Sequence, residues 1–237
     1  MFYQNYIKDV IMGKSDLLDG EIKVIQEHIY SGNIVFDVGA YVGEWSNEVL
    51  KRFPNVIIHQ FEPSPESFKN LLKNSQNNIN PKQIIRNNIV ISNKNHPVTF
   101  YYYQNCPVLS TTYRRNEKVE KEFNLEVRNK EVNSTTIDIY CGYKGIQHIN
   151  FLKIDTEGCE FDVIRGSEGL LRNKSINYIQ FEYGGCFIDS KTTLKEVFDY
   201  LKSFEYGVFK ILPEGLTEIT NFTPDLENYE YSNFLAY

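Results

Sequence analysis

The sequence lacks the cysteine patterns that stabilise small secreted domains or hold structural zinc. Its four cysteines are widely separated, and no two of them form a Cys-x-x-Cys pair. Isolated thiols of this kind are usually buried and act as small apolar side chains. We therefore expect neither a disulfide framework nor a zinc site, and we expect free thiols at the four positions. They are Cys106, Cys141, Cys159 and Cys186.

The chain also lacks an excess of positive charge. It carries 25 lysines and arginines against 31 aspartates and glutamates, a net charge of −6, and its isoelectric point is about 5.4. A protein that grips a phosphate backbone needs a basic face. The balance therefore argues against a nucleic-acid partner and favours a neutral or cationic small molecule.

Long apolar runs are missing as well. No segment approaches the roughly 18 apolar residues of a membrane span, and the N-terminus lacks the basic and apolar order of a secretion signal. We expect no membrane span and a cytoplasmic location. With 237 residues, 41% of them hydrophobic, the chain has the size of a single α/β domain.

Strand-like and helix-like patterns alternate along most of the chain. Apolar, β-branched runs predict strands at 33–38, 55–62, 83–91, 149–155 and 176–182. Helical periodicity predicts helices at 20–29, 43–52, 65–77, 160–171 and 192–204. This order predicts a mostly parallel sheet covered by helices on both faces.

Two segments interrupt the alternation. Residues 96–140 begin with the aromatic run "TFYYY" and continue as a charged segment, which predicts an extra hairpin and a mobile loop. After the fifth strand, "GVFKIL" and "NFLAY" predict two more strands, which could add an antiparallel pair at one sheet edge.

The stretch "IVFDVGAYVGEWS" joins the first strand to the next helix and contains Asp37, Gly39 and Gly43. Ligands of parallel sheets bind at the carboxyl ends of the strands, where glycines let the backbone approach closely. The second strand ends at Glu62, at the distance downstream where an acidic residue binds a ribose diol. The combination favours a nucleoside cofactor.

The dinucleotide fingerprint G-x-G-x-x-G is absent from this turn, which argues against NAD. S-adenosylmethionine has no phosphate to bind, and it offers a ribose diol to Glu62 and two cationic groups to carboxylates such as Asp37. Its adenine would lie near Asn88 and Ile89, at the end of the third strand. Further acidic residues at strand ends support a cationic ligand. They are Asp155 and Glu182, with Glu157 close behind Asp155.

Five blocks in order resemble the FkbM-type methyltransferases, a branch of the class I S-adenosylmethionine-dependent methyltransferases. The blocks are "FDVGAYVGEWS", "FEPSPESFKNLLKN", "NNIVISN", "FLKIDTEGCEFDVIRG" and "IQFEY". The resemblance implies a Rossmann-like α/β fold, with a mostly parallel seven-stranded sheet and an antiparallel last strand. Within one domain we expect a helical segment at 1–32, a cofactor-binding core at 33–182 with the insertion at about 96–140, and a C-terminal helix and strand pair at 183–237.

The same resemblance implies O-methylation of a hydroxyl on a sugar, glycan or glycosylated natural product. Tyr41 departs from the family, which usually has asparagine there. Carried over by position, the residues expected to bind the cofactor are Asp37, Gly39, Ala40, Tyr41, Gly43, Glu62, Pro63, Asn88, Ile89 and Asp155.

Three carboxylates, Asp155, Glu157 and Glu182, are the candidate catalytic residues, since no histidine falls at a ligand-edge strand end. Either Asp155 or Glu157 takes the acceptor's proton, or Asp155 and Glu182 hold Mg²⁺ or Mn²⁺, which lowers the hydroxyl's pKa. A third possibility is a degenerate module that binds the cofactor without turnover, within a glycan assembly complex.

Acceptor contacts are expected from the insertion and the tail. The tyrosines of the insertion could stack on sugar faces, and Arg114 with Arg115 could bind a phosphate of the acceptor. The alternation of "FYYY" favours an ordinary half-buried strand instead, and the arginine pair in a charged loop favours solvated side chains. The tyrosines are Tyr101, Tyr102, Tyr103 and Tyr113.

Overall fold

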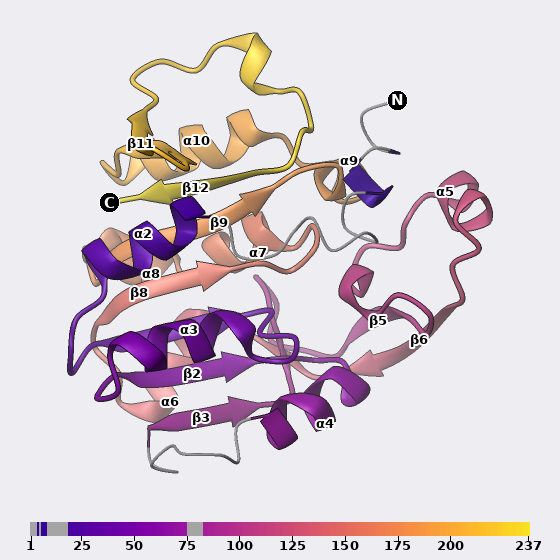
Figure 1. Cartoon of the computed structure of the whole chain (residues 1–237), viewed down its shortest axis with the longest axis horizontal. Helices are drawn as coiled ribbons and strands as arrows, with labels where there is room; N and C mark the ends of the chain where they lie inside the picture. Colours follow the sequence, from indigo (N-terminus) through magenta and orange to yellow (C-terminus); the bar gives the residue numbers. More distant parts are fainter. Residues whose placement is uncertain (1–3, 5, 9–18, 75–82) are drawn as a thin grey trace.

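An eight-stranded sheet runs through the computed structural model, which describes residues 4, 6–8, 19–74 and 83–237 (Figure 1). The strand order is β11-β10-β12-β9-β8-β1-β2-β3. From β3 to β9 all pairings are parallel, and β12 is antiparallel to both β9 and β10. The strands are β1 (Ile34–Val38), β2 (Ile57–Phe61), β3 (Ile84–Asn87), β8 (Ile149–Ile154), β9 (Ile176–Tyr183), β10 (Val208–Leu212), β11 (Gly215–Glu218) and β12 (Ser232–Ala236).

The sequence-based fold class is confirmed, and the expected strand count is corrected from seven to eight. The additional strand, β11, forms a tight hairpin with β10 in which Leu212 pairs with Gly215. Its sequence, "GLTE", is too short and too polar to stand out as a strand. The expected antiparallel pair at the β9 edge is formed by β12 and β10.

Helices cover both faces of the sheet because successive strand side chains point to opposite sides. Val35 of β1 belongs to one apolar cluster with Ile25 and Val49, whereas its neighbour Phe36 belongs to the other, with Val163. The first cluster is covered by α2 and α3 (Figure 1). The longer helices are α2 (Asp19–His28), α3 (Glu44–Arg52), α4 (Pro65–Asn74), α6 (Ile137–Lys144) and α10 (Leu194–Ser203), and the shorter ones are α7 (Glu160–Arg165), α8 (Glu168–Arg172) and α9 (Cys186–Ser190).

Two expected elements are each divided in the structure. The strand expected at 83–91 forms β3 and a separate β4 (Val90–Ile91), which pairs with β7 (Ser134–Thr135) in a second sheet. The helix expected at 160–171 breaks between α7 and α8 at Gly166, where a Cβ would lie 2.2 Å from the carbonyl oxygen of Ser92. The last three residues of the helix expected at 65–77 lie outside the described residues.

The segment after β4 contains the expected hairpin. β5 (Val98–Tyr103) pairs antiparallel with β6 (Val127–Val132), and the chain between them forms a short 3₁₀ turn, Pro107–Leu109, and α5 (Glu117–Glu122). A second 3₁₀ turn, Pro224–Leu226, precedes β12. In Figure 1 the hairpin and α5 project beyond the carboxyl ends of the parallel strands. No helix in the described part of the chain is long and apolar enough to cross a membrane.

Candidate functional site

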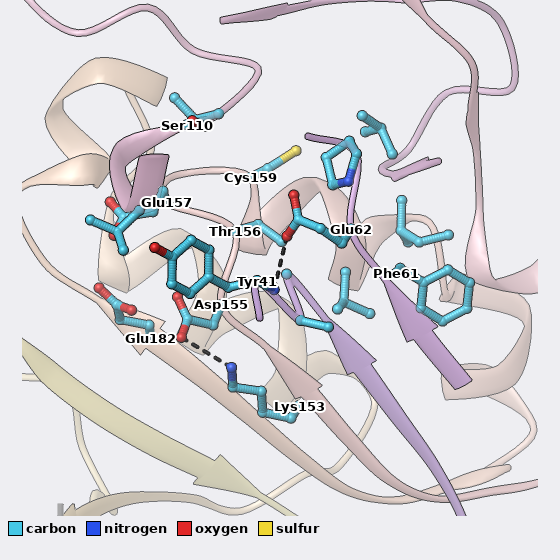
Figure 2. Close-up of a pocket in the computed structure, with 18 of the residues that line it drawn as sticks. Tyr41, Phe61, Glu62, Ser110, Lys153, Asp155, Thr156, Glu157, Cys159 and Glu182 are labelled. Atoms are coloured by element: carbon cyan, nitrogen blue, oxygen red, sulfur yellow. Dashed lines mark hydrogen bonds and ion pairs between the residues drawn. The ribbon is translucent and has the colours of Figure 1, made fainter. Parts of the chain in front are cut away.

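A cavity of about 270 Å³ lies at the carboxyl ends of β1, β2, β8 and β9 (Figure 2). The first three strands contribute their last residues or the turns that follow them. Residues 98–132, from the start of β5 to the end of β6, are called the hairpin segment here, and they contribute a wall that includes Phe100, Val108 and Thr111. Most of the residues expected at a cofactor or catalytic site line this cavity. They are Gly39, Ala40, Tyr41, Glu62, Pro63, Ile89, Asp155, Glu157 and Glu182.

The turn after β1 brings two strand ends into contact. Gly39 has φ of +82°, and a Cβ on it would lie 1.6 Å from the carbonyl oxygen of Asp155. Its amide and that of Ala40 both donate to the carbonyl oxygen of Phe61, at 3.0 Å. Only glycine fits this position, because both the backbone conformation and the neighbouring carbonyl exclude a side chain. The turn therefore forms a cavity wall made of backbone.

Glu62 is held at the end of β2 by two backbone amides. Its carboxyl oxygens accept hydrogen bonds from the amides of Tyr41, at 2.9 Å, and Ser64, at 2.8 Å. Burial raises the pKa of Glu62 to about 8, although these two hydrogen bonds oppose the shift. The fixed carboxyl group faces the cavity beside Tyr41 (Figure 2).

Three residues expected to contact the cofactor do not line the cavity. Asp37 is fully buried, where it accepts a hydrogen bond from Ser46 Oγ at 2.6 Å. Gly43 packs on Leu71, and Asn88 donates to the carbonyl oxygen of Glu62 at 2.7 Å. Each supports a lining segment from behind.

Lys153 lies below the turn, between two carboxylates. Its Nζ is 3.0 Å from Asp155 Oδ2 and 3.7 Å from Asp37 Oδ1, and its side chain is 8% exposed. The two carboxylates raise the pKa of Lys153 despite its burial, and Lys153 in turn lowers the pKa of Asp155 against the desolvation that raises it. The pKa of Asp37 is raised, because burial outweighs the Lys153 charge. Asp155 therefore remains an ionised side chain that is 36% exposed.

Glu157 is held by residues from distant segments. Arg115, from the hairpin segment, donates through Nη2 to Glu157 Oε2 at 2.5 Å and pairs through Nη1 with Asp189 at 3.2 Å. The hydroxyl of Tyr6 donates to the same Glu157 oxygen at 2.7 Å and lies 3.0 Å from Glu182 Oε1. The hairpin segment and the N-terminal residues thus reach the cavity wall from outside the sheet.

Glu182 is a buried carboxyl group that lies close to two other acids. Burial and the neighbouring charges of Asp155 and Glu157 raise its pKa well above the ordinary value, and its side chain hydrogen-bonds to Asp155. The carboxyl oxygens of Asp155, Glu157 and Glu182 lie within 4.8 Å of one another. This cluster occupies one end of the cavity, and Glu62 lies apart from it (Figure 2).

The loop between β8 and α7 is held by a buried acid. Glu160 accepts hydrogen bonds from the amides of Thr156, at 2.7 Å, and Gly158, at 2.9 Å. It lies in the first turn of α7, and so does Asp162, which pairs with Arg165. The glutamate fixes the backbone that carries Glu157, whose φ is +59°.

Of the arginine pair, Arg115 is not solvated, contrary to expectation, whereas the Arg114 side chain is 44% exposed, as expected. Arg115 has no exposed side-chain surface, and Arg114 pairs with Glu120 at 2.8 Å. Both guanidinium groups therefore already have carboxylate partners inside the fold. Two of the tyrosines are also engaged, Tyr103 with Glu120 and Tyr113 with Asp162.

Other side chains fill structural roles, as expected. His59 contacts the Tyr140 hydroxyl at 2.8 Å, away from the cavity, and burial lowers its pKa to about 4. All four cysteines are free and buried.

Lys153, Tyr6 and Glu160 are site residues to which the sequence-based predictions assigned no role in the site, and Arg115 was considered as a phosphate ligand or a solvated side chain, not as a partner of Glu157. A signal existed for Lys153, since it is the one charged residue in the apolar run "INFLKI". Tyr6 and Arg115 carry no such signal, because they are 151 and 42 residues from Glu157 in sequence.

Among solved structures, a methyltransferase FkbM from Methylobacillus flagellatus KT has a similar fold. The TM-score is 0.53 at 15% sequence identity, over 88% of this chain and 44% of that one. With the sheet order and the strand-end cavity, this likeness shows the fold of a class I methyltransferase.

Sequence comparison gives the family. The model described as the Methyltransferase FkbM domain matches residues 37–208, and the chain belongs to this family. Two fungal relatives are Methyltransferase 1 of Beauveria bassiana, 22% identical over 145 residues, and Methyltransferase sdnD of Sordaria araneosa, 23% identical over 171 residues. The matches cover 56% and 61% of this chain, and 58% and 66% of those relatives.

Proposed function

We propose that the protein is an S-adenosylmethionine-dependent O-methyltransferase whose acceptor is a hydroxyl of a sugar, glycan or glycosylated natural product. One observation carries the proposal: a single cavity joins the Glu62 carboxyl at the end of β2 to the carboxyl cluster at the ends of β8 and β9. A donor bound along the Gly39 turn would reach from one to the other. The family membership of the chain supports the same reaction class.

The cavity has a partner for each part of S-adenosylmethionine. The Glu62 carboxyl would accept hydrogen bonds from the ribose hydroxyls, and Pro63 and Ile89 would pack on the adenine. The backbone of Gly39 and Ala40 would form the cavity wall next to the methionine portion. The ionised Asp155 would stabilise the nearby positive charge of the donor.

Methyl transfer requires the acceptor oxygen, the methyl carbon and the sulfur to lie in line. The oxygen lone pair attacks the methyl carbon, the carbon–sulfur bond breaks with its electron pair going to sulfur, and the hydroxyl proton leaves. We assign this proton to Asp155, because it is ionised and the most exposed of the three carboxyls. Glu157 is bound to Arg115, and burial raises the pKa of Glu182 well above its ordinary value, so we assign both to orienting the acceptor.

A divalent cation is the alternative means of activating the hydroxyl. The oxygens of Asp155, Glu157 and Glu182 are close enough to share one ion, and carboxylates suit Mg²⁺ or Mn²⁺. Such an ion would lower the pKa of a bound hydroxyl. In this arrangement the three side chains would act as its ligands. Turnover that EDTA abolishes and Mn²⁺ restores would support this alternative over direct proton transfer to Asp155.

The test is S-adenosylhomocysteine formation with a panel of polyol and glycoside acceptors, comparing the wild type with Asp155→Asn. General-base assistance contributes about 10²- to 10⁴-fold, so the variant should lose turnover by that factor while S-adenosylmethionine affinity changes far less. Glu44→Gln is the matched control, because Glu44 lines the cavity but is exposed. Donor binding without product on any acceptor would favour the degenerate binding module.

A further inference from the structure

The cavity is lined by many acidic side chains and by few basic ones. Six of the described lining residues are aspartate or glutamate, and Lys153 is the single lysine or arginine among them. The six are Glu21, Glu44, Glu62, Asp155, Glu157 and Glu182. Four of the six are buried, so a ligand in the cavity would meet these carboxyl groups with little water between.

Both cations at the carboxyl cluster are already shared between carboxylates. Lys153 Nζ lies between Asp155, at 3.0 Å, and Asp37, at 3.7 Å. The Arg115 guanidinium lies between Glu157 and Asp189, and its side chain has no exposed surface. A phosphate at this end would have to break one of these ion pairs and would leave a carboxylate buried without its cation, which is costly.

The remaining groups of the cluster suit hydroxyl and ammonium groups. The carboxyl oxygens of Asp155, Glu157 and Glu182 accept hydrogen bonds from such groups. Their oxygens lie within 4.8 Å of one another, so one ligand group can contact more than one of them. A polyol hydroxyl or an ammonium donates to such oxygens, whereas a phosphate or carboxylate repels them.

We propose that the acceptor is a neutral or amino-bearing polyol with no phosphate or carboxylate beside the reacting hydroxyl. The proposal rests on the proposed function for the identity of the reaction, and it adds the charge class of the acceptor. Sugar phosphates and nucleotide sugars are accordingly rejected when their phosphate would enter the carboxyl cluster.

The charge of the cavity can be measured without any substrate. Cationic aminomethyl-proxyl and anionic carboxy-proxyl nitroxides enhance amide proton relaxation according to their local concentrations. A potential of one kT changes each concentration about threefold, in opposite directions. We expect the cation-to-anion ratio at the Thr156 amide to exceed that at Tyr30, which is 57% exposed and lies before β1. Asp155→Asn should reduce this excess, and an equal or smaller ratio at Thr156 would overturn the proposal.

The acceptor class is tested with three matched probes: glucose, glucosamine and glucose 6-phosphate. Saturation-transfer NMR on protein loaded with S-adenosylhomocysteine should show binding of glucose and glucosamine that exceeds binding of the phosphate ester severalfold. Binding of the phosphate ester as strongly as the other two, or no binding by any of the three, would overturn the proposal. A failure to bind S-adenosylhomocysteine would count against the proposed function and not against the charge class of the acceptor. The nitroxide measurement needs no cofactor, so it still tests the charge of the cavity in that case.

Discussion

Replacing Lys153 by methionine removes the cation that compensates two carboxylates below the cavity. At an effective dielectric constant of 20, the attraction is about 5.5 kcal/mol at the 3.0 Å distance to Asp155 and about 4.5 kcal/mol at the 3.7 Å distance to Asp37. The cost of burying the lysine offsets much of this, and solvent screens the partly exposed Asp155. Asp37 has no exposed surface, so the loss of its cationic partner accounts for most of the expected loss of stability.

The expected decrease in the free energy of unfolding is about 3 kcal/mol at pH 7, at the low end of values for breaking a buried pair. Urea denaturation measures it. Lys51→Met is the control, since Lys51 is 68% exposed and pairs with Glu48 on the surface, and it should change stability by about 0.5 kcal/mol or less. In the double variant Lys153→Met, Asp37→Asn the two effects should be less than additive. A loss below about 1 kcal/mol, or strict additivity, would refute the reasoning.

The same variant should show a distinct pH dependence. Without Lys153 the folded-state pKa of Asp37 rises further above its unfolded value, because the charge that lowers it is gone. An acid with a raised folded pKa binds more protons in the folded state, so stability falls as pH rises toward that pKa. The stability difference from wild type should therefore be larger at pH 8 than at pH 5. A stability difference between variant and wild type that stays constant from pH 5 to pH 8 would contradict the conclusion that Lys153 lowers the pKa of Asp37.

Three further substitutions test the site. Gly39→Ala should prevent stable folding, because its Cβ would lie 1.6 Å from the Asp155 carbonyl oxygen. The control Gly142→Ala lies in α6, where the added Cβ has open space, and it should unfold at the wild-type temperature or above. Equal melting temperatures for the two variants would refute the role of the turn. Tyr6→Phe removes one hydroxyl shared by two buried carboxyls and should cost about 1–3 kcal/mol in urea unfolding, while no change would mean that the hydroxyl contributes nothing. Burial raises the pKa of Glu62 to about 8, so wild-type stability relative to Glu62→Gln should fall as pH rises from 5 to 8, and the opposite slope would exclude the raised pKa.

Local patterns were enough to predict the core of the sheet and several residues that line the cavity at its edge. Val35 and Phe36 lie in apolar runs whose alternation fixes which face each covers, and the rule that ligands bind at strand ends located Glu62 and Asp155. Asp37 follows the same pattern yet lies under the cavity, because Ser46 and Lys153 bind it there. Sequence position gave its strand end but not the direction of its side chain.

Long-range contacts explain what sequence reasoning missed. Tyr6 and Arg115 reach Glu157 only because the N-terminal residues and the hairpin segment pack against the β8–α7 loop. No local periodicity encodes such docking. β11 escaped prediction because its pairing with β10 depends on a tight turn and not on an apolar run.

Calorimetric titration with S-adenosylmethionine, and separately with NAD, tests the central claim most directly. The account predicts saturable binding of S-adenosylmethionine at one site per chain, no binding of NAD, and weaker S-adenosylmethionine binding by Glu62→Ala than by the control Glu44→Gln. Absence of S-adenosylmethionine binding, or affinity that Glu62→Ala leaves unchanged, would contradict the assignment of this cavity as the methyl-donor site.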